Sequence, residues 1–582
     1  MPTKSDKAAA VIEGILTRMT MEEKVGQCFT YLWSGYLITP SVVEAIEKLH
    51  CGNLRLQPAF LSGKRHKYYD FDTGAGKYDY PATYKPIAET LLSPGGMGEI
   101  DPRRYAERLN RLQEIAMSRP CGIPLNMAVD QEGDVSRNYC FGGINLMPSP
   151  MGLAASGDPG FVYEAAKAVG RQLSAIGINC IHSPVADVNI NPRNPEIGIR
   201  SFGDDPKRVS EYALAAMKGL QDGGLITTAK HFPGRGDSMD DAHFGTPVLN
   251  VDRRRIDEVE LYPYRMLIEN GLDCVMIAHN VYTALDPGVI ATVSSKIIND
   301  LLRGELGFQG VVTTDAIAMR ALIKQYPLPE ACARALQAGA DMVLNKTETA
   351  YRDQGFLETL KYVQQGKISE EELNNKVRRI LRMKYRRGLF KNGAQVDASR
   401  ADAPIRDKAV IELSAKAARR AAIVLKDEPK LLPLSPKQKI LVIEQRLEDV
   451  YLGQNPSLHR LAFTEAMLSH SMNIVAADTE LKATPEDEAF VLPLADDADV
   501  VVVTNHYLRG DQNNSAFVRK LLDKRAKVVL VTNTPYEMAV VPGVRTAICT
   551  FAYTPESMKV AAGIIFGKEK AQGKWPLVNY RV

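Results

Sequence analysis

The sequence lacks an excess of charge of either sign and lacks an apolar run long enough to cross a membrane. It holds 72 basic and 69 acidic residues, a net charge of +3, and so gives no general argument for binding nucleic acid or an anionic membrane surface. Residues 1–19 are polar and then amphipathic, without the apolar core of a signal peptide. We therefore expect a cytoplasmic protein.

The sequence also has no C-x-x-C pair among its eight cysteines. Most of them lie in apolar or strand-like runs, where a cysteine is usually a buried free thiol. We expect free thiols in a reducing compartment rather than disulfides or a zinc site. These cysteines are Cys28, Cys51, Cys121, Cys140, Cys180, Cys274, Cys332 and Cys549.

Short apolar strands alternate with amphipathic helices through residues 1–390. A chain of 582 residues is long enough for two or possibly three domains, and repeated strand–helix units indicate a parallel sheet. No G-x-G-x-x-G fingerprint follows the first strand, and the number of units is near eight, so we predict a TIM-like (β/α)8 barrel. The strands expected there are residues 123–129, 180–188, 225–229, 274–278, 311–314 and 342–344.

A smaller α/β sandwich domain is expected at residues 405–582, after a linker at 391–404 that is rich in Gly, Asp, Ala and Ser. It should begin with a helix at 405–424, followed by strands at 440–444, 500–504, 527–532 and 545–550. The barrel itself should carry an inserted loop near residues 57–100 that holds five tyrosines. This loop is either a surface excursion or oligomer contact, or an aromatic wall that stacks on sugar rings.

Polar residues follow several of the predicted strands, at the end where a barrel places its active site. Asp130 ends one apolar strand and is suited to accept hydrogen bonds from hydroxyl groups, although helix capping is an alternative. Arg200 has glycines nearby and can donate to a hydroxyl or acyl oxygen, although a solvated salt bridge is an alternative. Lys230 and His231 end a third strand, and His279 after a fourth is expected to be a core or supporting residue.

Two further positions carry the chemistry that we expect. Asp241 and His243 can meet within one loop, so that the carboxylate orients the ring and raises the basicity of its other nitrogen. Asp315 ends a strongly apolar strand and precedes small residues, which leaves space for in-line attack by a nucleophile, although a helix cap is the alternative. A zinc site made by His231 and His243 with Asp237 or Asp241 is a weaker hypothesis, because no H-x-x-x-H or H-x-H pair exists.

The string KHFPGRGDSMDDAH at residues 230–243 resembles the signature of the β-N-acetylglucosaminidase branch of glycoside hydrolase family 3. The resemblance extends through VDQEG, IGIRSFGDDP and LLRGELGFQGVVTTDAIAM, and it includes the opening MTMEEKVGQ and the ending FGKEKAQGKWPL. It therefore covers nearly the whole chain. It implies a barrel followed by an α/β sandwich and a retaining double displacement. It further implies Asp315 as the nucleophile and His243 as the acid/base, with Asp241 as its partner. The residues implied to hold the sugar are Asp130, Arg137, Arg200, Lys230 and His231.

Three residues depart from the family signature: Arg235 stands for histidine, Ser238 for threonine and Ala242 for serine. Arg235 places a fixed charge near the acid/base loop and could favour an anionic substrate or acceptor. We therefore keep four hypotheses. The first is hydrolysis of a GlcNAc-terminated glycoside, chitin oligosaccharide or muropeptide, and the second is phosphorolysis with phosphate as acceptor. The third is a family 3 glycosidase for β-glucosides or β-xylosides, and the last is a non-catalytic sugar-binding protein. No cofactor or metal is expected, and the oligomeric state is not predicted.

Overall fold

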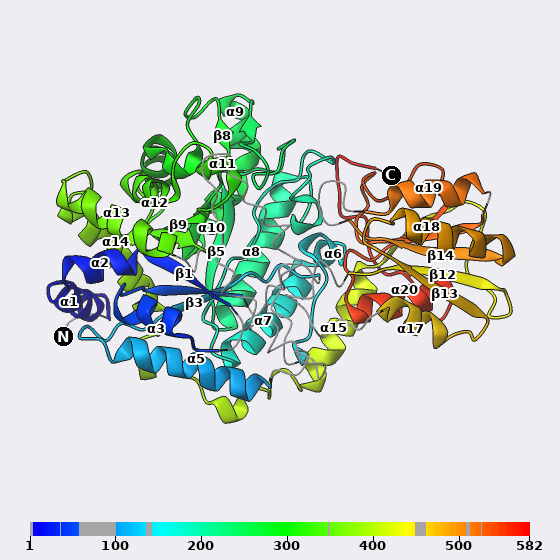
Figure 1. Cartoon of the computed structure of the whole chain (residues 1–582), viewed down its shortest axis with the longest axis horizontal. Helices are drawn as coiled ribbons and strands as arrows, with labels where there is room; N and C mark the ends of the chain where they lie inside the picture. Colours follow the sequence, from blue (N-terminus) through cyan, green and yellow to red (C-terminus); the bar gives the residue numbers. More distant parts are fainter. Residues whose placement is uncertain are drawn as a thin grey trace.

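The computed structural model describes residues 4–34, 37–57, 101–134, 143–346, 350–447, 461–507, 513–524 and 526–581. Figure 1 shows two lobes side by side, a barrel built from the first part of the chain and a smaller α/β lobe built from the last part. The predicted (β/α)8 barrel followed by a smaller α/β domain is therefore confirmed. The Tyr-rich insertion, Arg137 and Cys140 lie outside the described residues.

The barrel is a closed sheet of eight parallel strands, in the order β1-β10-β9-β7-β5-β4-β3-β2. Strand β1 pairs with both β2 and β10, which closes the sheet. Helices cover its outer face, and most residues of the strands are buried. The strands are β1 (Phe29–Ser34), β2 (Asn53–Gln57), β3 (Asn126–Val129), β4 (Cys180–Ile181), β5 (Ile226–Phe232), β7 (Cys274–Ile277), β9 (Val311–Ala316) and β10 (Met342–Asn345).

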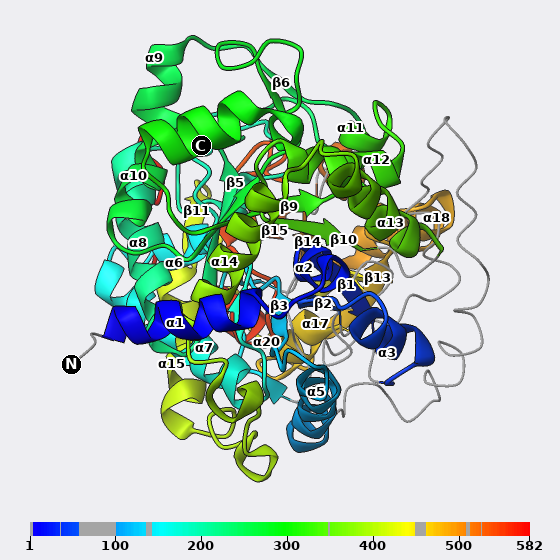
Figure 2. The same ribbon diagram turned by 90° about the vertical axis from the view of Figure 1, so that its left-hand side faces the viewer.

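Several helices around the barrel begin at residues whose side chains cap them. Thr20 caps α2 (Met21–Gln27) in a capping box, and the main-chain N–H of Thr20 donates to the Glu23 carboxylate at 2.9 Å. Figure 2 shows the helices surrounding the barrel strands. They are α1 (Lys4–Leu16), α2 (Met21–Gln27), α3 (Pro40–Glu47), α5 (Pro102–Met117), α6 (Pro150–Ala154), α7 (Pro159–Ala175), α8 (Pro206–Asp222), α9 (Arg253–Arg255), α10 (Tyr262–Glu269), α11 (Arg320–Ile323), α12 (Leu328–Gln337), α13 (Ala350–Gln364) and α14 (Glu370–Arg386).

Smaller elements decorate the loops of the barrel. Strands β6 (Val248–Leu249) and β8 (Val281–Tyr282) form a two-stranded sheet. Two stretches have π-helical geometry, η6 (Ile256–Glu260) and η8 (Lys296–Glu305), and two have 3-10 geometry, η5 (Gly198–Arg200) and η7 (Ala291–Val293). Of these, η5 carries Arg200, one of the predicted site residues.

The second lobe is built on a six-stranded sheet with the order β11-β16-β15-β14-β12-β13. Only the pairing of β11 with β16 is antiparallel. The strands are β11 (Ile423–Asp427), β12 (Ile440–Gln445), β13 (Ile474–Thr479), β14 (Val500–Asn505), β15 (Val528–Thr532) and β16 (Thr546–Cys549). The helices are α15 (Lys408–Ala421), α17 (Ala462–Leu468), α18 (Pro485–Val491), α19 (Ser515–Asp523) and α20 (Pro555–Ile565), with the 3-10 turn η11 (Leu492–Asp497).

Two predicted boundaries were wrong. The helix expected at residues 405–424 ends at Ala421, and the next residues form the edge strand β11. The strand expected at 180–188 ends at Ile181. Pro184 interrupts the ladder because proline has no N–H to donate, although Ala186 again donates to Lys230 O at 2.7 Å.

The stretch at residues 391–404, predicted as a linker, forms the short turns η9 (Lys391–Ala394) and η10 (Ala398–Arg400). It packs on α5, where Arg103 Nε lies 3.0 Å from Asp402 Oδ1 and Asn110 Nδ2 donates to Val396 O at 2.8 Å. The end of the chain also returns to the barrel, because the Asp204 carboxylate accepts three main-chain N–H groups from residues 578–580. The two lobes are therefore joined by specific polar contacts.

All seven described cysteines are buried free thiols, as predicted. No helix in the described part of the chain is both long enough and apolar enough to cross a membrane.

Candidate active site

The predicted polar residues meet at the carboxyl ends of the barrel strands. Asp130 directly follows β3, Lys230 and His231 lie near the end of β5, and Asp315 lies near the end of β9. These strands are parallel members of one closed sheet, so their carboxyl ends open at the same rim.

Asp130 is held by three basic groups at this rim. Arg55 from β2 forms an ion pair with one carboxylate oxygen, and Lys230 Nζ and His182 Nδ1 lie 3.2 and 3.3 Å from the other. Burial raises the pKa of Asp130, but the charges of Arg55 and Lys230 outweigh it and hold this pKa well below its ordinary value. Asp130 is therefore an ionised hydrogen-bond acceptor at the rim of the barrel.

Glu132 binds both predicted cations of the site. Arg200 makes a bidentate contact, with Nε 2.5 Å from Oε2 and Nη2 3.0 Å from Oε1. Lys230 Nζ lies 2.5 Å from Oε1. Because the side chains of Glu132 and Lys230 are almost fully buried, Arg200 belongs to a buried charge network and is not the solvated salt bridge of the alternative interpretation.

His231 is oriented by a buried aspartate. Its Nδ1 lies 2.7 Å from Asp187 Oδ2, and the main-chain N–H of Arg235 donates to Asp187 Oδ1 at 2.7 Å. Burial raises the pKa of Asp187 to about 6, against the lowering effect of Arg235. With Nδ1 directed at a carboxylate, Nε2 of His231 turns to the rim, where it lies 3.9 Å from Asp315 Oδ2 and 3.5 Å from Arg200 Nη2.

Asp315 is an ionised carboxylate near the carboxyl end of β9. Its Oδ1 accepts the main-chain N–H of Ala316 at 2.7 Å, and Arg235 Nη2 lies 3.6 Å from Oδ2. Burial raises the pKa of Asp315, whereas the charges of Arg235 and His279 lower it by a larger amount. This pKa therefore lies well below its ordinary value. This charge state suits a nucleophile, because only the ionised carboxylate can attack carbon.

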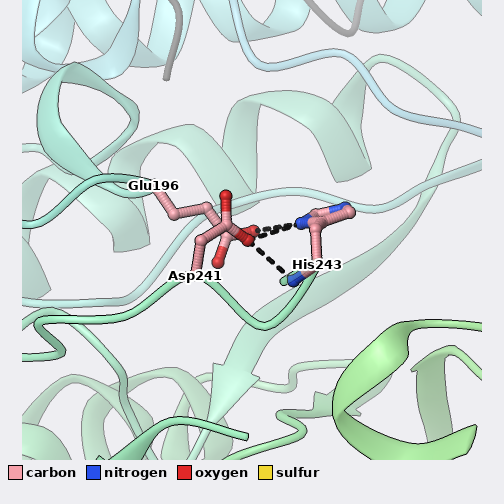
Figure 3. A group of neighbouring side chains, drawn as sticks. All are labelled: Glu196, Asp241 and His243. Carbon is pink, nitrogen blue, oxygen red and sulfur yellow. Dashed lines mark hydrogen bonds and ion pairs between the residues drawn. The ribbon is translucent and has the colours of Figure 1, made fainter. Parts of the chain in front are cut away.

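Asp241 and His243 form a close pair in the loop after β5. Nδ1 of His243 lies 2.6 Å from Asp241 Oδ1, and the main-chain N–H of His243 donates to the same oxygen at 2.8 Å. Glu196 approaches from a different loop, with Oε1 3.6 Å from the same ring nitrogen (Figure 3). The two carboxylates are buried, whereas 31% of the His243 side chain is exposed. The ring is thus fixed on one side and open on the other.

The loop that carries this pair is shaped by close packing. A Cβ on Gly236 would lie 1.8 Å from Val188 O, so only glycine fits at that position. Ala242 is fully buried in an apolar cluster with Met276, Ala316 and Leu344, and its carbonyl accepts the main-chain N–H of Ala321 at 3.2 Å. A methyl group at position 242 fits this apolar pocket, which accounts for the alanine between Asp241 and His243.

His279 supports the strand end that carries Asp315. It is fully buried, and its ring contacts Thr292 Oγ1 at 2.6 Å and Ala316 O at 2.9 Å. Burial lowers the pKa of His279, although the charge of Asp315 raises it. The structure therefore places it as a supporting residue, as predicted.

Three side chains are arranged closely enough to share a metal ion: Glu196, Asp241 and His243. The set predicted for zinc does not form, because His231 is paired with Asp187 and Asp237 is paired with Arg255 at 3.1 Å. Glu196 Oε1 already accepts from Arg235 Nη2 at 3.0 Å. A cation at this position would have to compete with a guanidinium group, so the arrangement fits a charge network better than a metal site.

The second lobe secures the loop that carries Glu196 and Arg200. Tyr507 Oη donates to Pro195 O at 3.2 Å, immediately before Glu196. Asn189 Nδ2 donates to Tyr536 Oη at 2.9 Å, while Asn189 Oδ1 accepts the N–H of Gly198 at 3.0 Å. Two tyrosines of the sandwich lobe therefore form hydrogen bonds that hold a loop at the barrel rim.

Comparison with known proteins agrees with this architecture. Residues 88–383, about half of the chain, match the family described as "Glycosyl hydrolase family 3 N terminal domain". The chain belongs to glycosyl hydrolase family 3. The resemblance seen in its motifs is thereby confirmed.

Relatives in the glycosyl hydrolase family 3 span most of the chain. Beta-hexosaminidase A from Pseudoalteromonas piscicida is 27% identical over 518 residues, covering 81% of this chain and 86% of that protein. A beta-N-acetylglucosaminidase/beta-glucosidase from Cellulomonas fimi is 28% identical over 481 residues, covering 78% and 84%. A solved structure of a family 3 beta-N-acetylglucosaminidase from Paenibacillus sp. str. FPU-7 is 28% identical, with a TM-score of 0.81 and coverage of 97% and 100%.

Several residues of this family 3 site were not predicted from the sequence. Two of them had a local signal, since Arg55 and Asp187 are charged residues inside apolar runs. Glu132 lies in the VDQEG motif, but the pattern did not separate its role from that of Asp130. Glu196 and Tyr507 had no signal, because only the fold brings their distant segments to the rim.

Proposed function

We propose that this family 3 protein is a retaining exo-β-N-acetylglucosaminidase that removes terminal β-linked N-acetylglucosamine by a double displacement. The observation that supports this most is the Asp241–His243 pair, with its 2.6 Å contact and exposed ring, at the same rim as ionised Asp315. An oriented acid/base and a separate carboxylate are the two groups that a retaining mechanism requires.

In the first step, an Asp315 carboxylate oxygen attacks the anomeric carbon while Nε2 of His243 donates its proton to the departing glycosidic oxygen. The bond to the leaving group breaks and an ester forms between the sugar and Asp315. In the second step, neutral His243 takes a proton from water, and the resulting hydroxide attacks the anomeric carbon. The sugar leaves with overall retention, and Asp315 is ionised again. Asp241 stabilises the imidazolium whenever His243 is charged.

The proposed sugar-binding residues are those of the charge network at the rim. Asp130 would accept hydroxyl protons, while Lys230 and Arg200 would donate to hydroxyl or acyl oxygens. His231 presents Nε2 to the same space. Arg137 is proposed for the same role from its sequence position alone, because it lies outside the described residues.

The preference for N-acetylglucosamine is supported by the Lys-His signature with its Asp-x-His pair, and by the names of relatives that act on hexosaminides. The alternative is a β-glucoside or β-xyloside preference, since one relative is named for both N-acetylglucosaminidase and β-glucosidase activity. A panel of nitrophenyl β-glycosides separates these. We expect kcat/KM for the N-acetylglucosaminide to exceed that for the glucoside and xyloside, whereas a reversed order would contradict the substrate class. The natural substrate would be a chitin oligosaccharide or a muropeptide cell-wall fragment.

We propose that water, and not phosphate, accepts the glycosyl group in the second step. Glu196 places a second carboxylate beside His243, which would repel an incoming anion. The guanidinium of Arg235 is buried and contacts Glu196 through Nη2, so its burial limits the access of an incoming phosphate. Analysis of products with and without phosphate tests this: only free sugar is expected, and formation of a sugar 1-phosphate would establish phosphorolysis instead. Binding without turnover would support the non-catalytic alternative.

A further inference from the structure

Glu196 connects the proposed acid/base to the proposed nucleophile through one arginine. Its Oε1 lies 3.6 Å from His243 Nδ1 and 3.0 Å from Arg235 Nη2. The same Nη2 lies 3.6 Å from Asp315 Oδ2. One guanidinium nitrogen is therefore shared between two carboxylates, one beside His243 and the other on Asp315.

Arg235 is a buried residue, and its ion pairs with Glu196 and Asp315 lie inside the protein. Its side chain is only 3% exposed, and its Nε and Nη1 are buried without a hydrogen-bond partner among the described residues. The hydrogen bonding of the group is concentrated on Nη2, the nitrogen between Glu196 and Asp315. When one of two carboxylates beside a buried cation loses its charge, the electrostatic balance between that cation and the other carboxylate changes strongly.

The charged groups around His243 define what such a change would do. Asp241 and Glu196 present carboxylates to its Nδ1. Behind them, Arg200 Nη1 lies 3.7 Å from Glu196 Oε1, and Arg235 connects Glu196 to Asp315. His279 lies within electrostatic range of both His243 and Asp315. The carboxylates favour a protonated ring, and the cations oppose it.

Formation of the glycosyl-enzyme changes this balance in one direction. Esterification removes the negative charge of Asp315, so Arg235 is left with Glu196 as its nearest carboxylate. The positive charge of Arg235 then offsets the charge of Glu196 more completely, and His243 loses electrostatic support for its imidazolium form. A group that must give a proton in the first step and take one in the second benefits from this fall in its pKa.

We propose that Glu196 is a positioning residue of the acid/base group, and that Arg235 couples it to the charge of Asp315. This coupling keeps His243 protonated in the free enzyme and makes it neutral in the glycosyl-enzyme. The inference rests on the proposed function, because it requires an ester on Asp315 and proton transfer by His243. It adds two residues, one of them a departure from the family signature, to the machinery of the reaction.

The test compares two pH profiles in the wild type and in the Glu196→Gln and Arg235→Gln variants. The basic limb of kcat/KM reports His243 in the free enzyme. The acidic limb of kcat, measured with a substrate whose leaving group is so good that the second step limits turnover, reports His243 in the glycosyl-enzyme. In the wild type, we expect the basic limb of kcat/KM to lie at higher pH than the acidic limb of kcat.

The two variants should move the basic limb of kcat/KM in opposite directions. Glu196→Gln removes a carboxylate and should shift it to lower pH, whereas Arg235→Gln removes a cation and should shift it to higher pH. Both substitutions should reduce the pH difference between the basic limb of kcat/KM and the acidic limb of kcat. If one variant does not fold, the other is sufficient for this test. Loss of packing alone would lower kcat without opposite shifts. The matched control is Glu330→Gln, which removes an ion pair with Arg334 on the outer helix α12.

Unchanged limbs in both variants would overturn the inference. Failure of the proposed function gives a different result, since no covalent sugar would then form on Asp315 of the wild type. If the covalent sugar forms and the limbs do not move, only the coupling through Arg235 is wrong.

Discussion

Nδ1 of His243 lies 2.6 Å from Oδ1 of Asp241, and the main-chain N–H of His243 donates to the same oxygen at 2.8 Å. The two contacts fix the ring from its side chain and its backbone together. Nε2, the ring nitrogen that does not face Asp241, is the one that we propose transfers a proton to a substrate.

Removing the charge of Asp241 should therefore slow proton transfer by His243 and have little effect on the stability of the fold. We expect Asp241→Asn to lower kcat by about 100-fold or more on substrates with poor leaving groups. The loss should be smaller for substrates with good leaving groups, which need little protonation in the first step. The control is Asp240→Asn, which changes an exposed carboxylate in the same loop. Equal effects of the two substitutions would contradict the role assigned to Asp241.

The loop around this pair requires glycine at Gly236, before the pair, but not at Gly245, after it. A Cβ at Gly236 would lie 1.8 Å from Val188 O, whereas a Cβ at Gly245 would meet nothing within 4 Å. We expect Gly236→Ala to displace the loop, to destabilise the protein by about 1–3 kcal/mol and to lower kcat/KM at least roughly tenfold. Gly245→Ala should leave both close to wild type. Thermal unfolding and steady-state kinetics measure the two effects, and similar results for the two alanines would show that the close approach does not matter.

The sandwich lobe should contribute to activity through Tyr507. Its hydroxyl donates to Pro195 O at 3.2 Å and helps to hold the loop that carries Glu196. Loss of one such hydrogen bond is expected to cost about 0.5–1.5 kcal/mol, so Tyr507→Phe should lower kcat/KM roughly twofold to tenfold. Tyr163→Phe removes a surface hydrogen bond to Asp222 on the far helices and should have no effect. A fully active Tyr507→Phe variant would limit the lobe to a structural role.

Glu260 should make the stability of the protein dependent on pH. Burial raises its pKa from 4.5 to about 7, although Arg255 lowers it, and its Oε2 has no hydrogen-bond partner within the described segments. The folded state thus holds the proton more tightly than the unfolded chain. The resulting stabilisation is complete below the unfolded pKa and is lost as the pH rises through about 7.

Glu260→Gln keeps the shape of the side chain and removes this dependence. Relative to wild type, we expect the variant to gain stability as the pH rises, by about 3 kcal/mol at about pH 8. Denaturant unfolding at about pH 5 and about pH 8 measures the difference. A constant difference between the two proteins would show that Glu260 does not titrate in this range.

The sequence predicted those parts of the site that depend on a single strand and the turn after it. Asp130, Lys230 and Asp315 follow or end apolar runs, and parallel strands in a barrel bring such ends to one rim. The contact of Asp241 with His243 is also local, since a single residue separates them along the chain. For these positions the chain geometry follows directly from the pattern of apolar and polar residues.

The parts that were missed depend on packing between distant segments. Glu196 reaches His243 from a separate loop, and Tyr507 reaches that loop from the other lobe. Strand β13 was missed because it lies at the edge of its sheet and is only partly buried, and its apolar run is limited to Ile474–Ala477. Strand β11 was missed because its apolar residues continue the run of the preceding helix.

The proposed mechanism requires that Asp315 forms a covalent bond to the sugar. The most direct measurement treats the enzyme with a ring-fluorinated N-acetylglucosaminyl fluoride, which slows hydrolysis of the intermediate, and then maps the labelled peptide by mass spectrometry. We expect one sugar per chain on the peptide that contains Asp315. Asp315→Ala should take no label and lose activity by about 10⁴-fold or more. A label on a different residue, or a fully active Asp315→Ala enzyme, would contradict the account.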